Sequence, residues 1–255
     1  MSRRMKTTLK IAAFAVMGLA MIISAQKINE TQAQYQQEKL LHQTLLVYKP
    51  VSRTNDDQML AAAEPETSEE PSAVALLRAQ YPSVVGWITI PGTKIDYPFV
   101  QADDNDKYLS ADLNGDYLAA GSVFLDYRSA PDFNLFNTVM YGHNMKNGSM
   151  FGSLPTLSDA ATFAQVVDGA VHLEGTEYRL EIFVCMVTNS YDGLVYNSLQ
   201  NTDEEKQEFL DYVQSNAVRY RDIGPKVTDR FLTLSTCSYE FADARTVVIG
   251  RLIEQ

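Results

Sequence analysis

Short apolar segments rich in β-branched residues recur at close spacing through the second half of the chain, and they constrain its fold more than any other feature. Most are long enough for one strand and too short for a helix of three turns. The segments 84–90 and 95–100 flank Pro91-Gly92, which predicts a hairpin. The other predicted strands are 122–127, 138–141, 171–173, 178–188, 230–236 and 246–253. About eight strands of this kind predict a mostly-β barrel or sandwich.

Two segments show helical rather than strand periodicity. The first is the short stretch 74–80, ahead of the first predicted strand. The second is 203–219, which Thr202 and Glu205 introduce with the pattern of a capping box. Its apolar stripe consists of Phe209, Leu210, Val213 and Ala217. We therefore expect a short helix at the start of the domain and one long helix before the penultimate strand.

The first 25 residues have the pattern of a Sec-type export segment. Four basic residues and no acid occupy the first ten positions, an uncharged apolar run covers 11–23, and Ser24-Ala25 forms a polar exit. Because Ile23 is too large for the third position before a cleavage site, we favour an uncleaved signal anchor whose basic end stays in the cytoplasm. The run is shorter than the roughly 20 residues that span a bilayer comfortably. A cleaved signal peptide therefore remains the alternative.

Residues 26–71 lack the composition of a folded domain. The part from 26 to 47 is rich in Gln, and no aromatic residue occurs between 49 and 80. Four glutamates and two prolines lie between 64 and 71. Such a composition cannot bury a core. We expect 1–25 to be the basic end and anchor, 26–71 an extracellular stalk, and 72–255 the folded domain.

Charge and cysteine content exclude several classes of function. The chain has 21 Lys and Arg against 32 Asp and Glu, a net charge of −11, which argues against a general nucleic-acid binder. Two cysteines are too few for a disulfide-dense scaffold or a four-cysteine zinc site. One cluster has the oxygen-bearing side chains typical of a calcium site. It consists of Asp103, Asp104, Asp106, Asp112, Asn114 and Asp116. It lacks the central glycine and closing Glu of an EF-hand loop, so we expect neither a metal nor another cofactor.

Cys237 is the better of the two candidate nucleophiles. Cys185 lies inside an apolar strand pattern typical of a buried side chain, whereas Cys237 ends the strand 230–236 and meets a polar stretch. A thiol at a strand end can reach a cleft while its strand stays rigid. From these residues alone, a disulfide between Cys185 and Cys237 remains an alternative.

A reactive thiol needs partners, and two residues stand at suitable places. His143 follows the predicted strand 138–141. Arg245 starts the last predicted strand, so it shares a rim with Cys237 if the last two strands are neighbours, and its guanidinium could stabilise an oxyanion. A structural histidine and a surface ion pair are the alternatives for these two residues.

Three stretches of the chain resemble the class B members of the sortase family. Residues 233–237 read TLSTC, which resembles the sortase TLxTC signature, and Arg245 stands eight positions after its cysteine. Residues 141–145 and 150–154 read YGHNM and MFGSL, which resemble the class B histidine loop. VGWI at 85–88, with IDYP at 95–98 and Gln101, resembles the first hairpin. The resemblance covers 74–253.

The resemblance implies a fold and a chemistry. The fold would be the eight-stranded sortase β-barrel, and the protein a membrane-anchored cysteine transpeptidase of a Gram-positive bacterium. Cys237 would attack the Thr carbonyl in the C-terminal sorting motif of a secreted protein, and Arg245 would stabilise the oxyanion. His143 would protonate the leaving amine and then act as base toward the incoming amine.

The incoming amine remains open at this point. It is either the cell-wall peptide of a lipid-linked peptidoglycan precursor or a lysine of a pilin subunit. We favour the wall precursor, since residues 26–80 lack the aromatic Asp-Pro-Phe/Trp lid of many pilin polymerases. A surface cysteine peptidase, in which water resolves the thioester, and an adhesion module with a decayed site are further alternatives.

Substrate contacts follow from the resemblance more loosely. They fall before the third predicted strand, in the loop ahead of the long helix, and just before the cysteine. The residues implied are Asn105, Leu109, Ser190, Tyr191, Leu194, Val195 and Ser235. Ordinary loop packing is the alternative for each of them.

Overall fold

A computed structural model describes residues 3–51 and 71–255. The chain divides into two compact units, Met1–Thr44 and Leu45–Gln255. The helix α1 (Arg3–Leu45) makes up the described part of the first unit. Within the described residues, no helix has both the length and the mean hydropathy of a membrane-spanning segment. The part of the predicted stalk from 52 to 70 lies outside the described residues.

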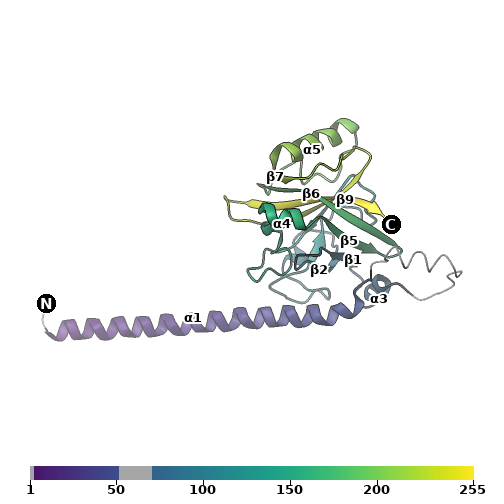
Figure 1. Ribbon diagram of the computed structural model, residues 1–255. Helices are drawn as coiled ribbons and strands as arrows, with labels where there is room; N and C mark the ends of the chain where they lie inside the picture. Colours follow the sequence, from purple (N-terminus) through teal and green to yellow (C-terminus); the bar gives the residue numbers. More distant parts are fainter. Residues whose placement is uncertain (1–2, 52–70) are drawn as a thin grey trace. The chain divides into compact units, whose positions relative to one another are not determined.

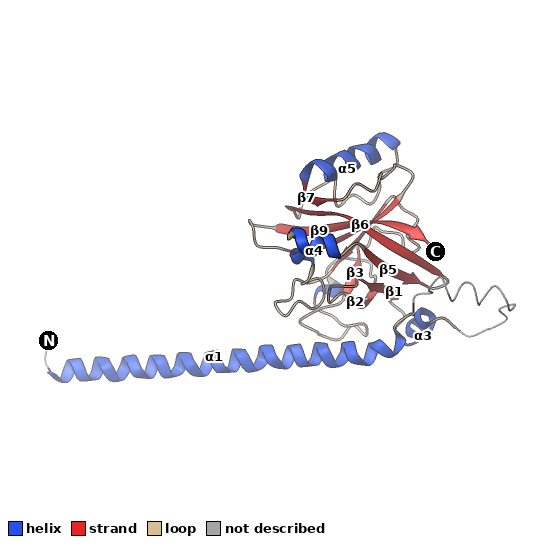
Figure 2. Cartoon of the chain, viewed as in Figure 1, coloured by secondary structure: helices blue, strands red, loops and turns tan. Residues whose placement is uncertain are grey.

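Eight strands of the second unit form a closed barrel (Figures 1 and 2). Their order is β5-β1-β2-β3-β4-β8-β9-β6, and β6 pairs back onto β5. Their bounds are β1 Val84–Thr89, β2 Asp96–Val100, β3 Val123–Leu125, β4 Asn137–Tyr141, β5 Asp168–Leu173, β6 Thr176–Asn189, β8 Arg230–Cys237 and β9 Ala244–Glu254. Each matches one predicted strand. The prediction of a mostly-β fold is confirmed, and the pairing of β5 with β6 makes it a barrel rather than a sandwich.

The strand β7 (Ala217–Tyr220) corrects the sequence prediction of a helix over 203–219. The helix α5 runs from Asp203 to Asn216 only, and Ala217 adopts extended backbone angles. Ala217 pairs with Met186 of β6, so backbone pairing with the barrel prevails over the helical spacing of the apolar stripe. The predicted capping box is present, since Thr202 and Glu205 each accept the other's backbone N–H.

The long helix α5 covers part of the barrel's outer face, above β6 and β7 in Figure 1. It packs Phe209, Leu210 and Val213 into a cluster with Phe183 and Phe231 of the barrel. Phe231 of β8 belongs to this cluster, and the strand is buried without a break from Phe231 to Thr236. This packing holds β8, and therefore its last residue, in a fixed position.

Several shorter elements complete the domain. The helix α3 (Ala73–Gln80) matches the predicted helix 74–80, and Ser72 caps its first turn. The helix α4 (Ala160–Gln165) and the 3₁₀ helices η1 (Leu46–Tyr48), η2 (Lys107–Leu109) and η3 (Leu154–Ser158) were not expected from the sequence. Residues 45–51 lie against the barrel, where Lys49 Nζ is 2.7 Å from Asp96 Oδ2.

Candidate active site

The register of the last two strands brings Cys237 and Arg245 together. The strands β8 and β9 are antiparallel, and their final pair is Cys237 opposite Arg245. Directly opposed residues in such a ladder have Cα atoms about 4.5–5.5 Å apart. Cys237 is exposed at this rim, and both cysteines are free thiols. The disulfide considered from the sequence is therefore absent.

His143 reaches the same rim through a parallel pairing. The strand β4 runs parallel to β8, with Tyr141 opposite Ser235, so the chains leave both strands side by side. The alignment continues beyond the strands, because Asn144 Nδ2 donates to the carbonyl of Cys237 at 2.8 Å. His143 lies two residues beyond Tyr141, and Cys237 lies two residues beyond Ser235, so the two occupy matching positions.

Gly142 occupies a position that admits no side chain. A Cβ atom there would lie 2.8 Å from Cγ of Phe151, a distance that real Cβ contacts essentially never show. Phe151 is fully buried, and its backbone N–H donates to the carbonyl of His143 at 3.0 Å. The glycine is therefore needed for the close packing of the loop 144–150 beneath the histidine.

A backbone carbonyl fixes the tautomer of His143. Its Nε2 lies 2.6 Å from the carbonyl oxygen of Leu109. Since a carbonyl oxygen only accepts hydrogen bonds, Nε2 must carry a hydrogen. In the neutral ring the lone pair is then on Nδ1, which makes Nδ1 the nitrogen able to take up and release a proton.

These residues surround a cavity of about 190 Å³ at the rim of the barrel. The lining residues are Asn105, Leu109, Phe124, Tyr141, Gly142, His143, Ser190, Tyr196, Ser235, Thr236, Cys237 and Arg245. The three residues implied for catalysis are all among them. Of the residues implied for substrate binding, the cavity includes four: Asn105, Leu109, Ser190 and Ser235.

Leu194 and Val195 do not line this cavity. Val195 is fully buried in the cluster beneath α5, and its carbonyl accepts from Asn137 Nδ2. Both residues follow Asp192, whose Oδ1 accepts their backbone N–H groups at 3.0 and 3.1 Å. The turn that this carboxylate stabilises directs Val195 into the core, so its side chain is not positioned for substrate contact.

Tyr196 is a lining residue that the sequence analysis missed. Its hydroxyl and Ser235 Oγ are 2.8 Å apart, and both residues are buried. Burial raises the pKa of Tyr196 to about 12, so its phenol stays protonated and neutral near pH 7. Its ring stacks on Tyr141, with centroids 6.2 Å apart. Position alone offered a weak signal for Tyr196, since it follows the loop residues implied by the resemblance.

Cys185 has the environment of a core residue. It is fully buried on β6, and burial raises the pKa of its thiol to about 11. The thiol therefore stays protonated and unreactive near neutral pH. This buried position agrees with the reading of its sequence context.

The acidic cluster before β3 serves local turns. Asp104 Oδ1 accepts the backbone N–H groups of Asp106 and Lys107, and Asp112 Oδ1 accepts those of Asn114 and Asp116. Within the described ranges, no three His, Cys, Asp or Glu side chains gather in a way that could hold a metal ion.

Comparisons with known proteins agree on one family. The family model described as "Sortase domain" matches residues 88–253. Sortase B of Listeria monocytogenes serovar 1/2a is 36% identical over 173 residues, which are 67% of this chain and 70% of that protein. Among similar solved structures, sortase B from B. anthracis in complex with AAEK1 is 32% identical with a TM-score of 0.73, covering 88% of this chain and 99% of that one. Sortase B from the Type II pilus of Streptococcus pneumoniae is 36% identical with a TM-score of 0.63, covering 71% and 98%.

Proposed function

The chain belongs to the sortase family as a class B member and is an enzyme of the cysteine transpeptidase type, and we propose that Cys237, His143 and Arg245 carry out its chemistry. The observation that carries the proposal is their convergence. Three residues from the ends of three strands line one cavity of about 190 Å³.

The first step of the proposed reaction is acyl transfer to the thiol. Cys237 Sγ attacks the carbonyl carbon of Thr in a C-terminal sorting motif, and the C–S bond forms. The oxyanion that develops lies beside Arg245, whose guanidinium stabilises it. The thiol proton passes through Nδ1 of His143 to the departing amine as the C–N bond breaks. A thioester and a free C-terminal fragment result.

The second step transfers the acyl group to an amine. The incoming amine attacks the thioester carbonyl, and Nδ1 of His143 accepts its proton. When the tetrahedral intermediate collapses, the C–S bond breaks and the proton returns to the thiol of Cys237. The Leu109 carbonyl holds Nε2–H throughout, so one ring nitrogen serves both steps.

We propose the lipid-linked wall precursor as the amine donor, with a pilin lysine as the second candidate. The absence of an aromatic Asp-Pro-Phe/Trp lid from residues 26–80 favours the wall precursor. A solved structure similar to this chain comes from a Type II pilus, so membership of class B does not discriminate between the two. A peptidase in which water resolves the thioester is the third candidate.

The proposed location is the outer face of the cell membrane. Arg3, Arg4, Lys6 and Lys10 precede the apolar run 11–23, which would anchor the chain with its basic end inside. Residues 26–71 would form the stalk, whose segment 45–51 lies against the barrel, and 72–255 would form the catalytic domain. Membrane fractionation before and after alkaline washing tests the anchor, and release of the chain by the wash would contradict it.

A ligation assay tests the proposed reaction. The full-length protein is incubated with a library of C-terminal sorting peptides and with either a wall stem peptide or a pilin-derived lysine peptide. Ligated products are identified by mass spectrometry. We expect products that join the peptide, up to its Thr, to the amine.

The two cysteines provide a matched pair of variants for this assay. Cys237→Ala must give no product, whereas Cys185→Ala must stay active because Cys185 lies in the core. Ligation by Cys237→Ala would contradict the proposed nucleophile. Hydrolysis without ligation for every amine would favour the peptidase.

A further inference from the structure

A fully buried carboxylate lies behind the catalytic cavity, at Asp126 directly after β3. Its side chain is 0% exposed, and it pairs with Arg128, whose side chain is 40% exposed. A buried charge is costly unless hydrogen bonds surround it. Its partners are therefore informative about why the chain has a carboxylate there.

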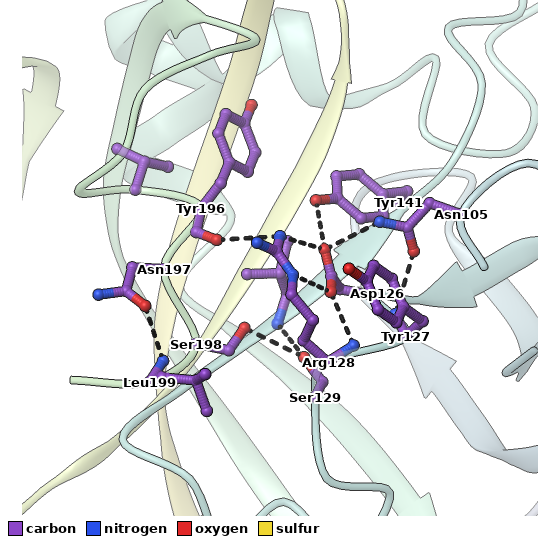
Figure 3. Close-up of polar contacts among 12 residues, drawn as sticks. Asn105, Asp126, Tyr127, Arg128, Ser129, Tyr141, Tyr196, Asn197, Ser198 and Leu199 are labelled. Atoms are coloured by element: carbon purple, nitrogen blue, oxygen red, sulfur yellow. Dashed lines mark hydrogen bonds and ion pairs between the residues drawn. The ribbon is translucent and has the colours of Figure 1, made fainter. Parts of the chain in front are cut away.

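Asp126 accepts five hydrogen bonds, as Figure 3 shows in part. Oδ1 accepts from the backbone N–H and Nε of Arg128, at 2.9 and 2.8 Å. Oδ2 accepts from Arg128 Nη2 at 2.7 Å, the Tyr141 hydroxyl at 2.9 Å and Asn105 Nδ2 at 3.0 Å. Burial alone would raise the pKa of Asp126, but these donors outweigh it and lower the pKa, so the group is a carboxylate near neutral pH.

Two of these donors line the catalytic cavity, and the ion pair reaches a third lining residue. Asn105 and Tyr141 are both lining residues. Arg128 Nη2 also donates to the carbonyl of Tyr196 at 3.2 Å. The ion pair of Asp126 and Arg128 therefore connects three walls of the cavity: the loop after β2, the end of β4, and the loop between β6 and α5.

The side-chain amide of Asn105 is held in one orientation. Its Oδ1 accepts the backbone N–H of Tyr127 at 3.0 Å, and its Nδ2 donates to Asp126. A carboxylate only accepts and a backbone N–H only donates, so the reverse orientation would lose both bonds. The second hydrogen of Nδ2 has no hydrogen-bond partner within the described part of the chain, so it can bind a peptide carbonyl.

We propose that Asp126, held by Arg128, is a positioning residue that fixes Asn105 with an N–H group presented to a carbonyl oxygen of the sorting peptide. The inference rests on the proposed function, since it assigns the cavity to that peptide. Asp126 touches neither the peptide nor the reacting atoms. Its effect passes through Asn105, and this makes it separable from a purely structural role.

A double-mutant cycle on the ligation reaction tests the proposal. The variants are Asp126→Asn, Asn105→Ala and the combination, assayed with the peptide that the wild-type protein ligates best. Asn at 126 lacks the carboxylate that selects one orientation of Asn105. We expect Asp126→Asn to raise KM about tenfold, roughly 1.4 kcal/mol, with kcat changed less than threefold. In the Asn105→Ala background the same substitution should change KM less than threefold.

The control variant is Glu181→Gln. Glu181 lies in the first half of β6, and the substitution disrupts its ion pair with Arg251 of β9. It should lower the melting temperature without changing KM. Equal effects of Asp126→Asn in both backgrounds, or no effect on KM, would overturn the proposal. A wild-type protein that ligates no peptide would instead count against the proposed function.

Side-chain amide NMR supplies a readout without substrate, should Asp126→Asn fail to fold. In the wild-type protein, one Nδ2 hydrogen of Asn105 should exchange slowly with solvent because Asp126 accepts it, and the other should exchange fast. The Asn105→Ala variant identifies the pair of signals. Two hydrogens that exchange equally fast would overturn the proposal.

Discussion

The packing of α5 on the barrel sets the stability of the site, and Phe209→Ala tests it. Phe209 is fully buried, with ring centroids 5.5 Å from Phe136 and 6.3 Å from Phe231. Truncation removes the ring's transfer free energy and leaves a cavity that β8 cannot close without moving. Substitutions of this kind cost about 3–5 kcal/mol. This is a large fraction of the 5–15 kcal/mol typical for a folded protein.

Urea denaturation followed by tryptophan fluorescence measures this loss. Trp87, the single tryptophan, is fully buried in β1 and reports unfolding of the barrel. We expect the free energy of unfolding to fall by about 3–5 kcal/mol with the slope on urea concentration unchanged. The neighbouring Glu208→Ala is the control, since Glu208 is exposed and its loss should cost no more than about 0.5 kcal/mol. A loss below about 1 kcal/mol for Phe209→Ala would refute the packing of α5 described above.

Three further predictions concern individual residues. Burial raises the pKa of Cys185 to about 11, so about one Cys185 thiol in a thousand is ionised at pH 8. Iodoacetamide should therefore label only Cys237 in the native protein. Two labels detected by mass spectrometry would contradict this. Gly142→Ala should cost about 1–3 kcal/mol of stability and most of the ligation activity, since the added Cβ meets the Phe151 ring. Adding Phe151→Leu to this variant should restore part of the stability and part of the activity. An unchanged melting temperature and activity in Gly142→Ala would count against the contact. Burial would raise the pKa of Asp96, but hydrogen bonds from Lys49, Trp87 and Thr89 lower it overall. The ionised Asp96 therefore adds to the free energy of unfolding above the unfolded-state pKa of about 3.9, and this contribution is lost as the pH falls through the lower folded-state pKa. Asp96→Asn should flatten the melting temperature against pH below about 4, and an unaltered slope would exclude this role.

Local patterns predicted the strands well, and non-local pairings explain what they missed. Each of the eight barrel strands follows an apolar run between turn residues, which is information present in the sequence itself. Closure into a barrel also depends on pairings between strands that are far apart in the sequence, β1 with β5 and β4 with β8, which apolar patterns do not encode. The four-residue strand β7 is too short to show a strand period, and Ala217 continued the helical spacing of the preceding stripe, so its pairing with β6 was missed. The six-residue helix α4 is too short for a helical period to show.

The candidate site divides in the same way. Cys237, His143 and Arg245 were identifiable because each stands at a strand end within a recognisable motif. Asn105 and Ser235 were found through the resemblance, and both line the cavity. Val195 was not distinguishable from Tyr196, because the turn at Asp192 determines which side chain enters the core and which reaches the cavity. Asp126 gave no signal, since its importance lies in five donors brought together by folding.

Intact-protein mass spectrometry of the acylated enzyme tests the central claim most directly. The full-length protein is mixed with a sorting peptide that it accepts in the ligation assay, in the absence of any amine, and the reaction is quenched in acid. We predict one adduct with the mass of the peptide up to its Thr, located on the tryptic fragment that contains Cys237 and removed by hydroxylamine. The adduct should be absent from Cys237→Ala and present in Cys185→Ala. Product formation by Cys237→Ala, or an adduct on any other residue, would contradict the account.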